Sequence, residues 1–115
     1  MKKIFHLSTC NTCQRIIREL NDGQDFELQD IKSDPIRPAQ LDFLHEKAGS
    51  YEALFSRRAR KYKSMGLAGQ QLTEADYRRL ILEEYTFLKR PVILIDEDIF
   101  IGSAPKTVAA AKAKL

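Results

Sequence analysis

The sequence predicts an α/β fold with a central mixed sheet of about four strands and a helical segment inserted between its two halves. Three observations carry this prediction. A strand–helix–strand pattern opens the chain, helical patterns fill the middle third, and a strand–strand–helix pattern closes it. The length of 115 residues suits a single domain, residues 1–115, in which we expect residues 36–86 to form the insertion.

The opening half is predicted from hydrophobic periodicity. Residues 4–7 form a short apolar run typical of a buried strand, and residues 11–20 have the spacing of an amphipathic helix. Gly23 suits the left-handed position that ends such a helix. Residues 26–31 begin by alternating apolar and polar side chains, which predicts a second strand with one face covered. A strand–helix–strand unit of this kind runs parallel with a right-handed crossover.

The middle third carries local signals for helices. Pro38 suits the first turn of a helix that Gly49 ends, and Thr73 is the expected N-cap of another, with Asp76 three residues later. Between them, five basic residues fall within one short segment, and they are Arg57, Arg58, Arg60, Lys61 and Lys63. Such a cluster could bind an anionic substrate, an acidic partner or a phosphate backbone, or be a solvated helix face.

The closing half predicts a hairpin followed by a helix. Residues 92–95 are four consecutive aliphatic residues after Pro91, which is typical of a buried strand that begins after a proline. Residues 96–98 form the expected turn, and residues 99–101 pair back as the second hairpin strand. Pro105 then opens an alanine-rich helix that we expect to run to residue 115.

The two cysteines of the chain, Cys10 and Cys13, lie at the start of the first predicted helix. The thiolate is the nucleophilic form of cysteine, and the unpaired N–H groups and dipole of a helix N-terminus favour that anion. Cys13 falls on the apolar stripe with Ile16, Ile17 and Leu20, one turn away, so it can reach back to form a disulfide. We therefore predict Cys10 as the exposed attacking thiol and Cys13 as the shielded resolving thiol.

Other interpretations of these cysteines are weaker. A structural zinc site needs about four ligands, whereas this chain has two cysteines and two distant histidines, His6 and His45, so no metal site is expected. Buried cysteines that act only as small hydrophobic residues stay a second alternative. Two cysteines without a wider disulfide framework fit a reducing cytoplasm, and no signal peptide or membrane-spanning run is visible. The net charge of +3 does not by itself argue for nucleic acid, and no direct nucleic-acid or membrane binding is expected.

Three motifs together resemble the arsenate reductase-like ArsC/Spx family, which has a thioredoxin-like fold with a helical insertion. The first is an aromatic residue and polar residues before a cysteine at a helix head. The second is the basic segment of residues 57–63, which is followed by Met65, Gly66 and Leu67. The third is Leu88-Lys89-Arg90-Pro91 before a hydrophobic strand and a glycine-bearing turn. The order and spacing of the motifs make the resemblance specific, and it covers essentially the whole chain.

The resemblance implies roles for individual residues. Cys10 matches the catalytic nucleophile, and Arg90 matches an arginine expected to bind the oxyanion of the substrate, because its planar fork suits an anion bidentately. Arg58 matches a second substrate-binding arginine, with Arg57 as the alternative. Pro91 matches the cis-proline position that lies beside the redox site. His6 matches a histidine that helps to hold the thiolate, although an ordinary strand histidine is an equal alternative.

The resemblance implies a thiol–disulfide oxidoreductase, most simply an enzyme. Cys13 and the lack of a third arginine near residues 102–106 differ from arsenate reductases of this type, whereas Spx regulators share the second cysteine. The alternatives are thus a redox-sensing regulator that binds RNA polymerase and a glutathione- or glutaredoxin-dependent arsenate reductase. We expect a monomer with no bound cofactor, with glutathione as a candidate co-substrate and glutaredoxin or thioredoxin as candidate donors.

Overall fold

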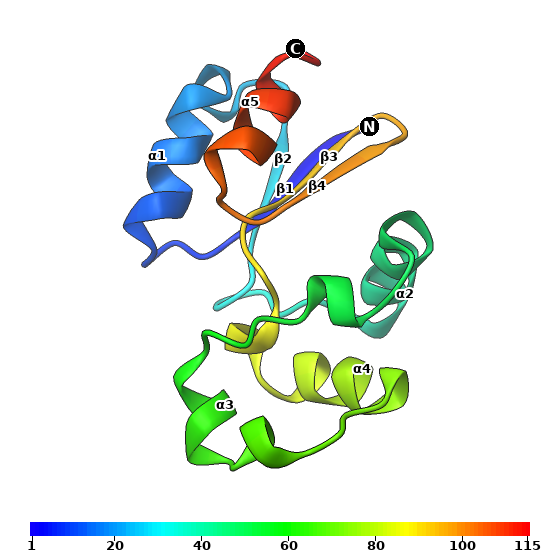
Figure 1. Ribbon diagram of the computed structural model, residues 1–115. Helices are drawn as coiled ribbons and strands as arrows, with labels where there is room; N and C mark the ends of the chain where they lie inside the picture. Colours follow the sequence, from blue (N-terminus) through cyan, green and yellow to red (C-terminus); the bar gives the residue numbers. More distant parts are fainter. The chain divides into compact units, whose positions relative to one another are not determined.

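The computed structural model describes residues 1–115, which separate into two compact units (Figure 1). The first unit comprises residues 1–35 and 90–115, and it contains all four strands. The second unit comprises residues 36–89 and is helical. Whether the two units count as a single domain with an insertion stays a prediction, and each is described in turn.

The first unit is built on one mixed sheet. Its elements in chain order are β1 (Lys2–His6), α1 (Asn11–Glu19), η1 (Asn21–Gly23), β2 (Glu27–Asp30), β3 (Val92–Ile95), β4 (Asp98–Ile101) and α5 (Pro105–Lys112). The strand order is β2-β1-β3-β4, with β1 parallel to β2 and antiparallel to β3, and with β3 antiparallel to β4. The predicted α/β class, with a strand–helix–strand opening and a strand–strand–helix ending, is therefore confirmed.

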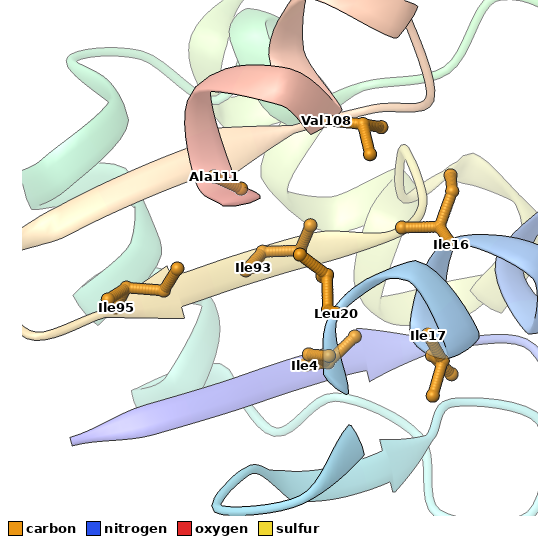
Figure 2. Packing of buried hydrophobic residues seen from close by; sticks show 8 residues of the cluster. All are labelled: Ile4, Ile16, Ile17, Leu20, Ile93, Ile95, Val108 and Ala111. Carbon is orange, nitrogen blue, oxygen red and sulfur yellow. The ribbon is translucent and has the colours of Figure 1, made fainter. Parts of the chain in front are cut away.

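The helices α1 and α5 pack on the same face of this sheet (Figure 1). Figure 2 shows the side chains that meet there, from β1 and β3 on one side and from the two helices on the other. They are Ile4, Ile93, Ile95, Ile16, Ile17, Leu20, Val108 and Ala111, each less than a tenth exposed. Burying one such aliphatic side chain stabilises a fold by about 1.5–3 kcal/mol, so this cluster holds α1 against the sheet.

The helix α1 ends before Gly23, the residue that the sequence predicted to end it. Leu20 caps the helix, and Asn21, Asp22 and Gly23 then take positive φ angles of 58°, 56° and 77°. At Gly23 a side chain would also crowd the core, because a Cβ there would lie 3.1 Å from Cγ2 of Ile17. Glycine is therefore the residue that lets the chain turn back from α1 into β2.

The covered face of β2 is not the one that carries its leucine. Leu28 is 45% exposed, whereas Gln29 is only 4% exposed. Gln29 is tolerated there because its side-chain amide donates a hydrogen bond to the backbone oxygen of Asp34 at 3.0 Å. As β2 is an edge strand, Leu28 has a neighbouring strand on one side only.

The second unit consists of short helices joined by turns. In chain order they are α2 (Pro38–Ala48), η2 (Glu52–Leu54), α3 (Arg60–Ser64), η3 (Leu67–Gly69), α4 (Glu74–Glu83) and η4 (Tyr85–Phe87). The predicted start at Pro38 and the left-handed Gly49 after α2 are both confirmed. So is the cap of α4, where the Thr73 hydroxyl accepts from the Asp76 N–H at 3.2 Å and the Asp76 carboxylate accepts from the Thr73 N–H at 2.9 Å.

An aromatic cluster forms the centre of the second unit. The ring of Phe55 lies 5.0 Å from that of Phe87, 4.9 Å from Tyr77 and 6.0 Å from Tyr62, measured between ring centroids. Such pairs add to the stabilisation that comes from burial alone.

None of the helices in either unit has the length and hydrophobicity that crossing a bilayer requires. The last helix is shorter than predicted, because it ends at Lys112 rather than at residue 115.

Candidate active site

Cys10 lies between β1 and α1, at the N-cap of the helix. Its backbone is extended, with φ of −95° and ψ of 113°, and its N–H donates to the backbone oxygen of Leu7 at 3.0 Å. The carbonyl of Cys10 accepts the first helical hydrogen bond, from the N–H of Gln14 at 3.1 Å. The thiol therefore stands at the end of the helix where backbone N–H groups have no helical partner.

The surroundings of Cys10 favour its thiolate. Partial burial raises the pKa of Cys10, but hydrogen bonds from the Cys13 backbone, the Cys13 thiol and the Thr12 backbone lower it, as does the positive charge of Arg90. The net result is a pKa below the ordinary value for cysteine. Since the side chain is also partly exposed, Cys10 has both properties that a thiol nucleophile needs.

Cys13 has the opposite character, although it lies within hydrogen-bonding reach of Cys10. It is 0% exposed, and burial raises its pKa to about 11, against a hydrogen bond with the Leu7 backbone that lowers it. The negative charge of Cys10 and the hydrogen bond to Cys10 raise it further, while Arg90 opposes them. At neutral pH, Cys13 is therefore the thiol that keeps its proton and can donate it towards Cys10.

Arg90 and Pro91 stand just before β3 in the same unit. The charge of Arg90 acts on both thiols, so the guanidinium lies close to them. The Arg90–Pro91 peptide bond is cis, which confirms the bond geometry expected from the resemblance. The carbonyl of Pro91 accepts a hydrogen bond from the N–H of Gly102 at 2.9 Å, which fixes the start of β3 against the end of β4.

His6 is buried at the end of β1 and is 8% exposed. Burial lowers its pKa, and the charge of Asp30, its partner in the β1–β2 ladder, partly opposes this. The imidazole is therefore neutral at pH 7, and its buried Nδ1 has no hydrogen-bond partner. The groups that act on its pKa do not include Cys10, so its role in holding the thiolate stays a prediction.

The two predicted arginines of the basic segment lie in the second unit. Arg57 donates to the Glu52 carboxylate at 2.6 Å and to the Tyr77 hydroxyl at 2.9 Å, so it is engaged within that unit. Arg58 is exposed. Binding of a substrate by Arg58, or by Arg57 in its place, stays a prediction.

Asp30, at the end of β2, lies outside the motifs that mark the site in the sequence. Its carboxylate accepts hydrogen bonds from the Ser8 N–H at 3.1 Å, from the Lys32 N–H at 3.2 Å and from the Ser33 hydroxyl at 3.2 Å. Aspartate side chains often accept a hydrogen bond from the backbone N–H two residues further along the chain. That signal could have predicted the bond to Lys32, but not the long-range bond to Ser8.

No group of three or more His, Cys, Asp or Glu side chains is placed to hold a metal ion. The candidate site thus consists, within the first unit, of two thiols of opposite character and one guanidinium that acts on both. An arrangement of this kind can bind a negative charge next to a reactive sulfur.

The chain matches the ArsC family over residues 5–111. Among solved structures, it is similar to an arsenate reductase from Vibrio cholerae, with 19% identity, a TM-score of 0.80 and 95% of each chain covered.

An arsenate reductase-related protein from Brucella melitensis is also similar, with 23% identity and a TM-score of 0.73, covering 95% of this chain and 92% of that one. No curated protein sequence matches. Both structural likenesses concern the thioredoxin-like fold, whereas the family match spans nearly the whole sequence, and this chain therefore belongs to the ArsC family.

Proposed function

We propose that this protein is a thiol–disulfide oxidoreductase in which Cys10 is the nucleophile and Cys13 is the resolving thiol. The observation that carries the proposal is the pairing of two adjacent thiols whose pKa values are shifted in opposite directions. The pKa of Cys10 is lowered, while burial raises the pKa of Cys13 to about 11. Such a pair can attack in a defined order, because Cys10 ionises at a lower pH than Cys13.

In the first step, the thiolate of Cys10 attacks one sulfur of a disulfide substrate. A bond forms between Cys10 and that sulfur, the substrate disulfide breaks, and the other half leaves as a thiolate that takes a proton from solvent. In the second step, Cys13 loses its proton and its sulfur attacks Cys10, which forms the Cys10–Cys13 disulfide and releases the second half of the substrate as a thiolate that takes up a proton. The substrate gains two electrons and the protein loses two, which a dithiol donor or two thiols must restore.

The second step becomes easier because the first has occurred. Two of the causes that raise the pKa of Cys13 are the negative charge of Cys10 and the hydrogen bond to it. Both disappear once Cys10 is part of a mixed disulfide, whereas the positive charge of Arg90 remains. Formation of the mixed disulfide therefore lowers the pKa of Cys13 and prepares it to attack.

Arginines supply the binding of an anionic substrate in this proposal. Arg90 acts on both thiols, so an anionic group of the substrate next to the reacting sulfur would meet its guanidinium, and Arg58 or Arg57 would add a second cation. Glutathione mixed disulfides and oxyanions both carry such negative charge. Arsenate is the oxyanion that the similarity to the arsenate reductase from Vibrio cholerae suggests, and glutathione, glutaredoxin or thioredoxin would be the donor.

The test compares the parent with Cys10→Ser and Cys13→Ser variants, with glutathione disulfide as substrate. We expect Cys10→Ser to release no thiol above background, because serine is a far weaker nucleophile. Cys13→Ser should stop after the first step and carry one glutathione on Cys10, which intact mass spectrometry detects. Thr12→Ala is the matched control, since only the backbone of Thr12 acts on Cys10.

A Cys10→Ser variant that reduces disulfides at the parental rate would refute the proposal. Repeating the assay with arsenate, glutathione and glutaredoxin separates an oxyanion reductase from a disulfide reductase. A parent protein that forms the Cys10–Cys13 disulfide but turns over neither substrate would favour the alternative of a redox-sensing regulator, for which retention of RNA polymerase is the direct measurement.

A further inference from the structure

Asp30 joins the end of β2 to the turn that carries Cys10. One oxygen of its carboxylate accepts from the Ser8 N–H at 3.1 Å and from the Lys32 N–H at 3.2 Å. The other oxygen accepts from the Ser33 hydroxyl at 3.2 Å. Of these three bonds, only the one to Ser8 crosses from β2 to the segment between β1 and α1, and it therefore ties two distant parts of the chain together.

Ser8 is held from a second direction as well. Its carbonyl oxygen accepts a hydrogen bond from the side-chain amide of Gln14 at 3.2 Å, and Gln14 lies in α1. A backbone hydrogen bond from the Cys10 N–H to the Leu7 oxygen at 3.0 Å closes a turn that contains Ser8. Residues 7–10 are thus fixed both to the neighbouring strand and to the helix that begins after Cys10.

We propose that Asp30 is a positioning residue, which holds the turn at Ser8 so that the Cys10 sulfur faces the N-terminus of α1. The backbone groups of Thr12 and Cys13 reach the Cys10 sulfur only while Cys10 keeps its extended conformation at the N-cap. Asp30 is not among the groups that act directly on the pKa of Cys10. It acts through the backbone that leads to Cys10.

This positioning role can be separated from a simple effect of the Asp30 charge, because the two predict opposite changes in the pKa of Cys10 when Asp30 is removed. The negative field of a carboxylate disfavours a nearby thiolate, so if Asp30 acted by its charge, its removal would lower the pKa of Cys10. If it acts by positioning, its removal loosens the turn and raises that pKa. The other charged or titratable groups involved are Arg90 and Cys13, which face Cys10, and His6, which faces Asp30.

The experiment measures the rate of Cys10 alkylation by iodoacetamide as a function of pH in a Cys13→Ser background. Asp30→Ala removes the hydrogen bonds to Ser8, Lys32 and Ser33. We expect the apparent pKa of Cys10 to rise by about one unit, which lowers the alkylation rate about tenfold at pH values well below that pKa. Asp30→Asn removes the charge but keeps an oxygen that can accept from Ser8 and Lys32. It should therefore restore most of the parental rate.

Ser33→Ala is the matched control, because it removes a bond to Asp30 that does not reach the Cys10 turn, and it should leave the profile unchanged. Asparagine and alanine variants with the same shift, or a lower pKa in both, would overturn the proposal. Should Asp30→Ala fail to fold, Gln14→Ala loosens the same Ser8 peptide from the other side. It must raise the pKa of Cys10 for the proposal to stand.

The inference rests on the proposed role of Cys10 as nucleophile, but its test does not depend on turnover. Alkylation reports the ionisation of Cys10 directly and can be measured even if the protein reduces neither disulfides nor arsenate. Failure of the Asp30 series would leave the disulfide chemistry of Cys10 and Cys13 intact, and failure of the turnover assay would leave the Asp30 series intact.

Discussion

Cys10 shows how a thiol in a short turn is made acidic by several small contributions. Two backbone N–H groups, a thiol donor and one guanidinium act together against the effect of partial burial. Among these groups, only Arg90 carries a full charge at every pH at which the protein would be studied. It is therefore the contribution that a single substitution removes most cleanly.

We predict that Arg90→Ala raises the pKa of Cys10, because a positive charge that stabilises the thiolate is lost. Since the thiolate is the reactive form, alkylation of Cys10 should slow by several-fold at pH values below its pKa. The measurement is again the pH dependence of the alkylation rate. Arg90→Lys, which keeps the charge, should lie closer to the parent, and Arg15→Ala, on the exposed face of α1, should match it.

An alkylation profile for Arg90→Ala that coincides with the parental one would mean that the backbone of α1 suffices to ionise Cys10. In that case Arg90 would act on the substrate alone.

At the scale of elements, the helix α1 is held by its apolar stripe rather than by its caps. No side chain caps its N-terminus, and its first turn contains no acidic residue to complement the helix dipole. Ile16, Ile17 and Leu20 instead pack into the cluster on the sheet (Figure 2). Because the site depends on where α1 begins, this packing links the stability of the first unit to the position of Cys10.

Two leucines of the first unit provide a matched test of this packing. Leu20 is 0% exposed and Leu28 is 45% exposed. We expect Leu20→Ala to lower the free energy of unfolding by about 2–5 kcal/mol, because it leaves a cavity, and Leu28→Ala to lower it by less than about 1 kcal/mol. Urea denaturation followed by circular dichroism measures both. Equal losses would contradict the packing described for α1.

Some elements could be predicted from the sequence better than others. The ends of the helices in the second unit are predicted by local signals, which are Pro38, Gly49 and the Thr73–Asp76 pair, and each lies where the sequence predicts it. The burial of β2 could not be predicted in the same way. Whether Leu28 or Gln29 is covered depends on neighbours that the strand order supplies, and alternation along one strand carries no information about them.

In the candidate site, too, local features could be predicted from the sequence and long-range contacts could not. The start of α1 at Cys10, with Cys13 one turn inside, is readable because two cysteines and an apolar stripe are close in sequence. Asp30 is not, because its bond to Ser8 exists only once β1 and β2 pair in register. Sequence motifs reveal groups that react, whereas the groups that hold them in place are found from the fold.

At the scale of the whole molecule, each unit contains one aspartate with a strongly lowered pKa. Partial burial raises the pKa of Asp30, but hydrogen bonds from Ser8, Lys32 and Ser33 outweigh it and bring the value to about 2. In the second unit, hydrogen bonds from Arg78 and Tyr51 lower the pKa of Asp42 to about 2. Arg78 donates to both carboxylate oxygens of Asp42, at 2.8 and 3.1 Å.

We predict that these two carboxylates make the protein less stable in acid. Because their pKa values in the folded state lie below the ordinary value of about 3.9, the stability they contribute is present above about pH 4 and is lost as pH falls towards 2. Chemical denaturation at several pH values should show this loss. Asp42→Asn should make the decline shallower, and a decline as steep as in the parent would exclude Asp42 as a contributor.

The position of β1 in the sheet has a consequence for how the chain folds during synthesis. β1 lies between β2, which follows it closely, and β3, which is separated from it by the whole second unit. As the polypeptide emerges, β1, α1 and β2 can form early, but one edge of β1 stays open until residues 92–95 are made. The sheet around the N-terminal segment that carries both cysteines is therefore completed only when the C-terminal hairpin pairs with it, and pairing over so long a sequence separation slows folding.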